Sequence, residues 1–247
     1  MSYPINVIKA TGEVEPFAEK RVIASLLRAG ASPNLAQKIV SQIKPHLYQN
    51  IPSFEIYDMV MRILKKEKRD LAERYNLKRA IMELGPSGYP FEKYVAEILR
   101  EQNHQAEINK LVRGKCVTHE IDIVAKNKKT FMIECKFHSQ AGGRTGIKEA
   151  LFTYARFLDV KEEGFDIPWL ITNTKVTQEA KTYATCVGMR VTSWDYPVGE
   201  SLRELIDKSR LHPITASTTL SQKQKQALLE KGVIFFHELT VSPGRGR

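Results

Sequence analysis

A short run of glycine and proline divides this chain into two parts. Residues 84–90 read LGPSGYP and place two glycines and two prolines in seven positions between strongly helical patterns. Because glycine and proline interrupt helices and strands, such a run is typical of a linker. The 247 residues, 42% of them hydrophobic, are enough to bury a core in one or two domains. We therefore expect the main domain boundary at this run.

The segment before the linker predicts a small hairpin followed by four helices. Ile5, Val7 and Val14 flank the turn at Thr11-Gly12 in an alternating pattern, as expected for two short strands. Beyond them, apolar residues recur at a spacing of three and four, which indicates amphipathic helices. These helices are expected over residues 18–29, 34–47, 53–66 and 69–83.

The segment after the linker predicts a second domain of mixed α/β order. A helix over 90–102 precedes two strands, 116–125 and 130–137, and a helix over 146–160 follows them. Two further apolar strands, WLITNT and GMRVTSW, enclose another helix, and two helices complete the tail. The expected organisation is a first domain of residues 1–84, a linker of 85–88, a second domain of 89–196 and a helical extension of 197–247.

Net charge and cysteine count narrow the possible functions. With 38 Lys and Arg against 28 Asp and Glu, the chain carries a formal charge of +10, which favours a nucleic-acid partner. The three cysteines and six scattered histidines lack disulfide or zinc-ligand spacing, so any metal must be held by oxygen atoms. No apolar run approaches the roughly 18 residues of a membrane span, and no secretory-signal pattern opens the sequence. We expect a cytoplasmic protein without a membrane partner.

Charged side chains interrupt the predicted second-domain hairpin where buried strands should be apolar. Glu134 and Lys136 project from one strand face about 6 to 7 Å apart, because strand side chains alternate and rise about 3.3 Å per residue. If Asp122 on the partner strand lies opposite them, two carboxylates and an ammonium group converge, which suits a hard divalent cation and a polarised water. The alternative is an exposed cross-strand ladder of salt bridges.

The spacing of these residues resembles the PD-(D/E)XK restriction-endonuclease-like superfamily. Eleven residues separate Asp122 from Glu134-x-Lys136, and a helix with Phe91-Glu92 precedes them. Ile121 stands where the namesake proline often stands. The resemblance covers residues 89–196 and implies a nuclease fold with a mixed sheet between helices, α/β/α, as in type IV restriction enzymes.

The same resemblance implies roles for individual residues. The carboxylates of Asp122 and Glu134, with the carbonyl of Cys135, would hold Mg²⁺ or Mn²⁺. Lys136 would orient or activate the attacking water. Phosphodiester hydrolysis needs such a metal to neutralise the charge that develops on phosphorus, and a nucleophile placed in line.

Two helices lie beside this motif in the sequence. Glu92 borders the apolar face of its helix more closely than Glu97 does, so we expect Glu92 at the catalytic site. Its alternative is a solvated glutamate at the helix edge. The helix over 146–160 carries Lys148 and Arg156, which we expect on a solvated face without a catalytic role.

The first domain resembles the ATP-cone, a nucleotide-sensing module at the front of ribonucleotide reductases. The resemblance covers residues 3–83 and rests on VIKATGEVEPF, the following Lys20-Arg-Val and the late motif LAERYNLKR. It implies a hairpin with four helices, ATP or dATP as an effector, and a homo-oligomer that depends on the nucleotide. It places Val7, Lys9, Glu15 and Lys20 at the nucleotide.

Two departures from the ATP-cone pattern bear on nucleotide binding. Ala10 stands where an arginine commonly follows the first lysine, and Ala18 stands where Asp or Asn commonly follows the phenylalanine. One phosphate contact is therefore missing, and a charge-assisted contact contributes about 1.5 to 3 kcal/mol. Such a loss lowers affinity about tenfold or more. The alternative is a helical docking module that binds no nucleotide.

Together these features predict a Mg²⁺-dependent endonuclease that hydrolyses DNA, with an N-terminal regulatory domain that binds a nucleotide. The alternative is a non-catalytic, nucleotide-responsive DNA-binding regulator that keeps only the nuclease fold. Asp122, Glu134 and Lys136 favour the enzyme, because an inactive site has no reason to keep carboxylates buried together. The sequence has no GxxxxGK[ST] loop, which argues against nucleotide hydrolysis by the first domain. It leaves open whether the substrate is DNA or RNA, and duplex, branched or modified.

Overall fold

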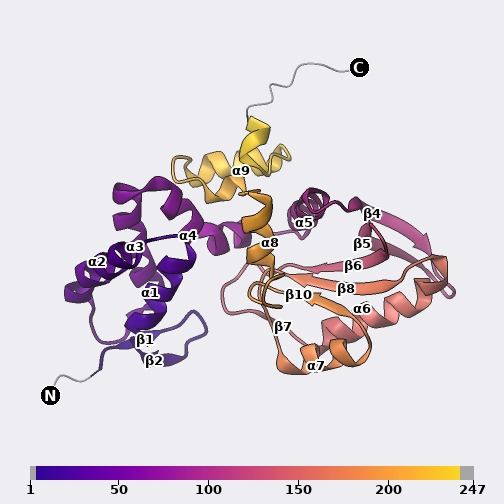
Figure 1. Ribbon diagram of the computed structural model, residues 1–247, viewed down its shortest axis with the longest axis horizontal. Helices are drawn as coiled ribbons and strands as arrows, with labels where there is room; N and C mark the ends of the chain where they lie inside the picture. The colour runs from indigo at the N-terminus through magenta and orange to yellow at the C-terminus, as the bar shows by residue number, and fades with distance from the viewer. Residues whose placement is uncertain (1–3, 240–247) are drawn as a thin grey trace. The chain divides into compact units, whose positions relative to one another are not determined.

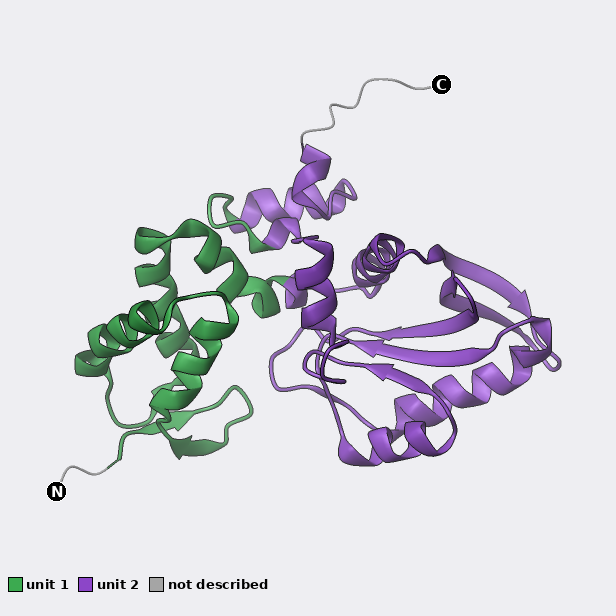
Figure 2. Cartoon of the chain, in the orientation of Figure 1, with its two compact units in different colours: residues 1–80, 216–221 green, residues 81–215, 222–247 purple. Residues whose placement is uncertain are grey.

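The computed structural model describes residues 4–239 of the chain (Figure 1). The chain divides into two compact units (Figure 2). Unit 1 consists of residues 1–80 with 216–221, and unit 2 consists of residues 81–215 with 222–247. The first and last predicted segments also include residues 1–3 and 240–247, which lie outside the described residues.

Unit 1 begins with the predicted hairpin. β1 (Asn6–Ile8) pairs antiparallel with β2 (Val14–Pro16), and Gly12 in the connecting turn has a φ of +82°, a conformation that favours glycine. β3 (Ile51–Pro52) pairs parallel with β1 and makes a three-stranded sheet. The sequence pattern did not predict β3, because two residues are too few to show an alternation.

Four helices complete unit 1, as the sequence predicts. α1 (Glu19–Arg28), α2 (Pro33–Ile43), α3 (Ser53–Glu67) and α4 (Arg69–Met82) lie within a few residues of the predicted bounds. The Ser32 hydroxyl accepts a hydrogen bond from the Leu35 amide and caps α2. The helices bury their apolar faces in one core that also holds the inward face of β1. Its fully buried members include Leu26, Ile39, Ile43, Ile51 and Leu64.

Unit 2 is built on a five-stranded sheet in the order β10-β8-β6-β5-β4. β4 (Gln105–Arg113), β5 (Thr118–Lys126) and β6 (Thr130–Lys136) are antiparallel, whereas β6, β8 (Ile167–Thr172) and β10 (Arg190–Thr192) are parallel. α5 (Tyr89–Glu101) lies on one face, and α6 (Ile147–Val160) and α7 (Gln178–Cys186) lie on the other (Figure 1). The predicted mixed sheet between helical layers is confirmed.

The pattern did not predict β4. Within β4 only Ala106 is buried, because the strand forms one edge of the sheet and exposes most of its side chains. Asn109 has a φ of +52° and is skipped in the pairing of β4 with β5, which continues at Ile108 and at Lys110. A strand with one buried residue shows no alternation of apolar and polar positions.

The C-terminal extension contains the two predicted helices, α8 (Leu202–Ser209) and α9 (Gln222–Glu230). Ser201 and Glu204 form a capping box at the start of α8. The Tyr94 hydroxyl of α5 donates to the Leu211 carbonyl at 2.6 Å, and its ring stacks on Phe235. These contacts join much of the extension to unit 2. Two short strands, β7 (Arg144–Thr145) and β9 (Lys175–Val176), form a separate parallel pair, and single-turn 3₁₀ helices cover 44–46, 161–163, 214–216 and 236–239.

Candidate active site

β5 and β6 bring Asp122 and Glu134 to adjacent positions. The two strands are antiparallel, with Ile123 opposite Ile133. Asp122 and Glu134 each lie one residue beyond this pair, toward the same end of the hairpin. The Asp122 carboxylate accepts a hydrogen bond from the backbone amide of Cys135, with Oδ2 and N 2.8 Å apart. This bond fixes the Asp122 side chain against the backbone of the Glu134-x-Lys136 segment.

The two carboxyl groups share a region that is poor in solvent. Burial, followed by the charge of Asp122, raises the pKa of Glu134 to about 7, although Arg156 and Lys136 oppose the change. Burial also raises the pKa of Asp122, and the Cys135 amide opposes that increase. Both carboxyl groups therefore have perturbed pKa values, which are common at functional sites.

α5 adds Glu92 to this cluster. Burial is the main reason that the pKa of Glu92 rises to about 7, and the charges of Asp122 and Glu120 contribute. Glu97, the other candidate on α5, instead forms an ion pair with Arg100. The structure thus places Glu92, Asp122 and Glu134 close enough to interact, and leaves Glu97 outside.

Lys136 is the last residue of β6 and pairs in register with Thr172 of β8. Its charge lowers the pKa of both Glu134 and His138, so its ammonium group lies near the cluster. Within residues 4–239, Lys136 forms no ion pair with Asp122 or Glu134. The cross-strand salt-bridge ladder is therefore not the arrangement that these residues adopt.

The sequence analysis missed Arg156. Its guanidinium reaches from α6 to the Glu134 carboxylate and to the carbonyl of Glu120, and 12% of its side chain is exposed. The expected solvated position is wrong for Arg156, because it flanks the buried face of α6 formed by Thr153 and Phe157. The only sequence feature that could have indicated this position is that Arg156 directly precedes Phe157, a buried residue of α6.

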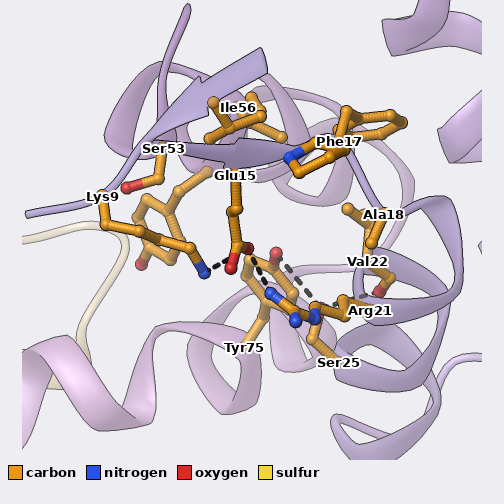
Figure 3. A pocket seen from close by; sticks show the side chains of 13 residues that line it. Lys9, Glu15, Phe17, Ala18, Arg21, Val22, Ser25, Ser53, Ile56 and Tyr75 are labelled. Atoms are coloured by element: carbon orange, nitrogen blue, oxygen red, sulfur yellow. Dashed lines mark hydrogen bonds and ion pairs between the residues drawn. The ribbon is translucent and has the colours of Figure 1, made fainter. Parts of the chain in front are cut away.

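Unit 1 contains a separate pocket between the hairpin and helices α1, α3 and α4 (Figure 3). Its lining includes three residues predicted at a nucleotide, Val7, Lys9 and Glu15. Lys20 is exposed on α1 and does not line the pocket, whereas the next residue, Arg21, does. The other lining residues are Pro16, Phe17, Ala18, Val22, Ser25, Ser53, Ile56, Tyr57 and Tyr75.

Glu15 holds the two cations of this pocket. Figure 3 shows its carboxylate between Lys9 and Arg21; the Lys9 Nζ lies 2.7 Å from Oε1, and Arg21 pairs with the same oxygen. Arg21 first, and then Lys9, lower the pKa of Glu15. The pocket therefore places two positive groups and one negative group beside an apolar lining.

Models of known protein families match both parts of the chain. A family model described as ATP cone domain matches residues 5–83, and one described as restriction endonuclease, the Mrr catalytic type, matches residues 85–206. The chain therefore carries an ATP cone domain followed by a restriction endonuclease domain. A third model, AF1548-like C-terminal, matches residues 212–244.

The chain is similar to an uncharacterized protein of Archaeoglobus fulgidus. It is 43% identical over 151 residues, which cover 61% of this chain and 85% of the relative. The crystal structure of a protein of unknown function, AF1548, has a TM-score of 0.56 at 42% identity and covers 62% of this chain and 83% of its own. MspJI restriction endonuclease, in complex with a 27-mer oligonucleotide, has a TM-score of 0.36 at 14% identity and covers 82% of this chain and 44% of its own.

The metal site expected in the second domain would use oxygen atoms as its ligands. Within residues 4–239, no three His, Cys, Asp or Glu side chains form a metal-binding group. The expected set needs only the carboxylates of Asp122 and Glu134 and the Cys135 carbonyl. Because both carboxyl groups have raised pKa values, an added cation would relieve their repulsion, so these residues fit an oxygen-preferring divalent cation.

In the described part of the chain, no helix combines the length and the apolar character needed to cross a membrane.

Proposed function

We propose that the second unit is a Mg²⁺- or Mn²⁺-dependent endonuclease that hydrolyses DNA, and that the first unit is its nucleotide-binding regulatory domain. The observation that carries the proposal is the cluster of Glu92, Asp122 and Glu134. Burial raises all three pKa values, and the charge of Asp122 adds to the rise at Glu92 and Glu134. Such a cluster is unfavourable for folding, and perturbed carboxyl groups of this kind gather at catalytic sites. The net charge of +10 supports a polyanionic substrate.

The residues of the chain divide the chemical work. The carboxylates of Asp122 and Glu134 and the carbonyl of Cys135 would hold the metal, and the Cys135 amide keeps the Asp122 carboxylate oriented. When bound, the metal would lower the pKa of a water molecule and neutralise charge on the scissile phosphate. Lys136 holds the attacking water and balances negative charge on the phosphate oxygens.

Glu92 is suited to proton transfer. A group with a pKa near the working pH is a good acceptor and a good donor, and the pKa of Glu92 is raised to about 7. Glu92 lies on α5 rather than on the hairpin, so it approaches the cluster from a different element than the metal-holding residues. We assign it the role of taking a proton from the attacking water.

Cleavage assays on the purified full chain test this proposal. Duplex, branched and single-stranded DNA and RNA are incubated with Mg²⁺, with Mn²⁺ or with EDTA. We expect metal-dependent cleavage that Asp122→Ala and Glu134→Ala abolish. Lys136→Ala should retain substrate binding while it loses activity about 100-fold or more, because it acts on the transition state.

The matched control is Glu97→Ala, which removes a glutamate from the same helix as Glu92 but outside the cluster, and should cut normally. Circular dichroism shows whether each variant folds. Equal cleavage by wild type and by both carboxylate variants would trace the activity to a contaminant and overturn the assignment. Tight DNA binding without cleavage in any metal would favour the non-catalytic regulator.

A further inference from the structure

The amide side chain of Asn173 pairs with the backbone just beyond the end of β6. Its Oδ1 accepts a hydrogen bond from the His138 amide at 2.9 Å, and its Nδ2 donates to the His138 carbonyl at 2.8 Å. Asn173 is 1% exposed, so these bonds form away from solvent. One side chain thus satisfies both backbone polar groups of His138, which lies outside the strands of the sheet.

This pairing extends the sheet where its backbone hydrogen bonding ends. Lys136 of β6 and Thr172 of β8 are the last residues of their strands and lie opposite each other. Asn173 directly follows Thr172, and His138 lies two residues after Lys136. The Asn173 amide has a donor and an acceptor, as a peptide unit has, so it takes the place of backbone groups that a longer β8 would supply. The end of β6 is therefore fixed on the side of β8.

The His138 side chain is held as well. Its Nε2 lies 3.1 Å from the Thr145 hydroxyl, which donates to the Thr172 hydroxyl at 2.9 Å. Both threonines are fully buried. A Cβ at Gly143 would lie 2.9 Å from His138 Nδ1, so the chain also passes close to the other ring nitrogen. His138 is thus fixed through its backbone and through its imidazole.

Phe137 connects the same segment to the helix that carries Glu92. Its ring centroid lies 5.6 Å from that of Phe91, which is buried and directly precedes Glu92 on α5. Residues 136–138 are therefore held from two directions, by α5 through Phe137 and by the chain after β8 through Asn173. These contacts place the backbone of Lys136 relative to Glu92, the other side chain assigned to the attacking water.

The position of the Lys136 ammonium group depends on this backbone. Across the described residues, 4–239, no ion pair with Asp122 or Glu134 holds the ammonium group itself. Successive strand side chains point to opposite faces, so a rotation of the backbone at the strand end would turn the lysine away from the carboxylates. A displacement of about 1 Å at a reacting group can lower a rate about 100-fold. A contact that fixes the end of β6 therefore matters for a reaction that uses Lys136.

We propose that Asn173 is a positioning residue of the nuclease site, which holds the backbone at His138 and thereby directs the Lys136 ammonium group toward the carboxylate cluster. The inference rests on the role proposed for Lys136 in cleavage. It assigns no contact between Asn173 and the substrate, the metal or the attacking water.

Single-turnover cleavage by the full chain, with enzyme in excess over DNA, tests the proposal. We expect Asn173→Ala to lower the cleavage rate about 10- to 100-fold, because Lys136 is displaced. The Kd for DNA, measured in EDTA, should stay within about twofold of the wild-type value, because positioning acts on the chemical step.

The matched control is Thr192→Val, which removes the buried hydroxyl that accepts a hydrogen bond from the Trp169 indole at 3.0 Å. Thr192 lies on β10, which β8 separates from β6. The variant loses a buried hydrogen bond of the same sheet, so its Tm should fall while its cleavage rate stays at the wild-type value.

A double-variant cycle with Lys136→Ala separates positioning from a purely structural role. If Asn173 acts through Lys136, Asn173→Ala should lower the rate of the Lys136→Ala variant by no more than about twofold. An equal factor in both backgrounds would make Asn173 a residue of the fold alone and overturn the proposal. Wild-type cleavage by Asn173→Ala would overturn it as well. Asn173→Ser, whose hydroxyl retains one polar group, takes the place of the alanine variant if that variant does not fold.

A measurement without cleavage distinguishes this inference from the proposed nuclease activity. Burial, and then the charge of Lys136, lower the pKa of His138, so Lys136→Ala should raise that pKa. NMR titration of the imidazole should show a smaller rise in the Asn173→Ala background, where the ammonium group is no longer held in place. A chain that cleaves no substrate but shows this difference would contradict the nuclease activity and retain the positioning of Lys136. An equal rise in both backgrounds would overturn the positioning, also where Lys136→Ala cleaves too slowly to measure.

Discussion

Arg156 decides the charge balance of the carboxylate cluster. Its guanidinium pairs with Glu134, whose pKa is nevertheless raised to about 7 by burial and by Asp122. Both side chains are largely buried, with 12% of Arg156 and 20% of Glu134 exposed, so solvent screens the pair only partly. Removing the arginine would leave a buried carboxylate with less compensation.

This pairing predicts a pH-dependent loss of stability in Arg156→Ala. A carboxyl group whose pKa is raised in the folded state destabilises the fold when it ionises, so stability increases as the pH falls through about 7 toward the ordinary glutamate value. The variant raises that pKa further. We expect it to be less stable than wild type by about 2 kcal/mol at pH 8, from the lost charged hydrogen bond. The deficit should shrink toward pH 5, measured by thermal melting.

The control for Arg156→Ala is Lys110→Ala, which breaks the exposed pair of Lys110 with Glu107 on β4. Exposed pairs contribute about 0 to 1 kcal/mol, so this variant should melt close to wild type at both pH values. Mg²⁺ should raise the Tm of Arg156→Ala more than that of wild type, because a cation can replace the lost charge. A deficit that is the same at pH 5 and pH 8 would contradict the role given to Arg156.

At the scale of residues, strand alternation predicts more of the site than helix periodicity does. The alternation in β6 puts Glu134 and Lys136 on one face whatever packs against it. The position of Arg156 depends on the rotation of α6 against the sheet, which periodicity gives only to within a residue or two. Arg21 shows the same limit, since it lines the pocket of unit 1 where the adjacent Lys20 does not.

At the scale of elements, Asp159 joins α6 to the β4–β5 hairpin. Its carboxylate accepts hydrogen bonds from the amides of Cys116 and Val117 and from His119 Nε2, at 2.8, 3.2 and 2.8 Å. A Cβ at Gly114 would lie 2.2 Å from the same carboxylate, so only glycine fits the turn there. One side chain at the end of a helix thus fixes a hairpin that has few buried residues of its own.

Asp159→Asn tests this connection. His119, and then the two amides, hold the pKa of Asp159 well below its usual range. A carboxyl group with a lowered folded-state pKa stabilises the protein above its unfolded-state pKa, and that contribution disappears as the pH falls through the folded-state value. We expect Asp159→Asn to lower the Tm by several degrees at pH 7, with a difference from wild type that narrows steadily in acid.

The comparison for Asp159→Asn is Asp195→Asn, which alters a half-exposed aspartate 3.8 Å from Lys175 and should leave the Tm nearly unchanged. Hydrogen exchange would locate the effect, because Asp159→Asn replaces one carboxylate oxygen by an NH₂ group and leaves the amides of Cys116 and Val117 with one oxygen in place of two. Unchanged protection of those amides would show that Asp159 does not hold the hairpin.

Most elements could be predicted because their apolar residues recur with the right period. The helices of both units differ from their predicted bounds by a few residues, since caps such as Ser32 and Ser201 mark the starts. β4 and β3 could not be predicted for opposite reasons. β4 is long but buries one side chain, and β3 buries Ile51 but has two residues.

At the scale of the whole molecule, the chain carries two separate charge clusters. In unit 2 the carboxylates outnumber the cations of the cluster, whereas in unit 1 two cations share the single carboxylate of Glu15. The first arrangement attracts a cation and the second an anion. The linker composition predicts the division into two parts, but not that residues 216–221 belong to unit 1, where Thr218 donates to Glu73.

The unit 1 cluster predicts that ATP or dATP stabilises the chain. A phosphate group that replaces the Glu15 carboxylate would contact Lys9 and Arg21, and Arg21 can supply the charge that Ala10 lacks. A ligand that binds only the folded state stabilises it by about 2.7 kcal/mol at one hundred times its Kd. We expect the Tm to rise with millimolar ATP or dATP, measured by calorimetry.

Four variants separate the possible sources of that shift. Lys9→Ala and Arg21→Ala should each reduce it, because each removes a charged contact that contributes about 1.5 to 3 kcal/mol. Asp122→Ala should keep the full shift, which separates the pocket of unit 1 from nucleotide bound through metal in unit 2. Lys20→Ala tests whether this exposed lysine contacts the phosphates, as the ATP-cone resemblance implies. Without any shift at millimolar ATP and Mg²⁺, Glu15 would remain the permanent partner of both cations, and unit 1 would act as a docking module.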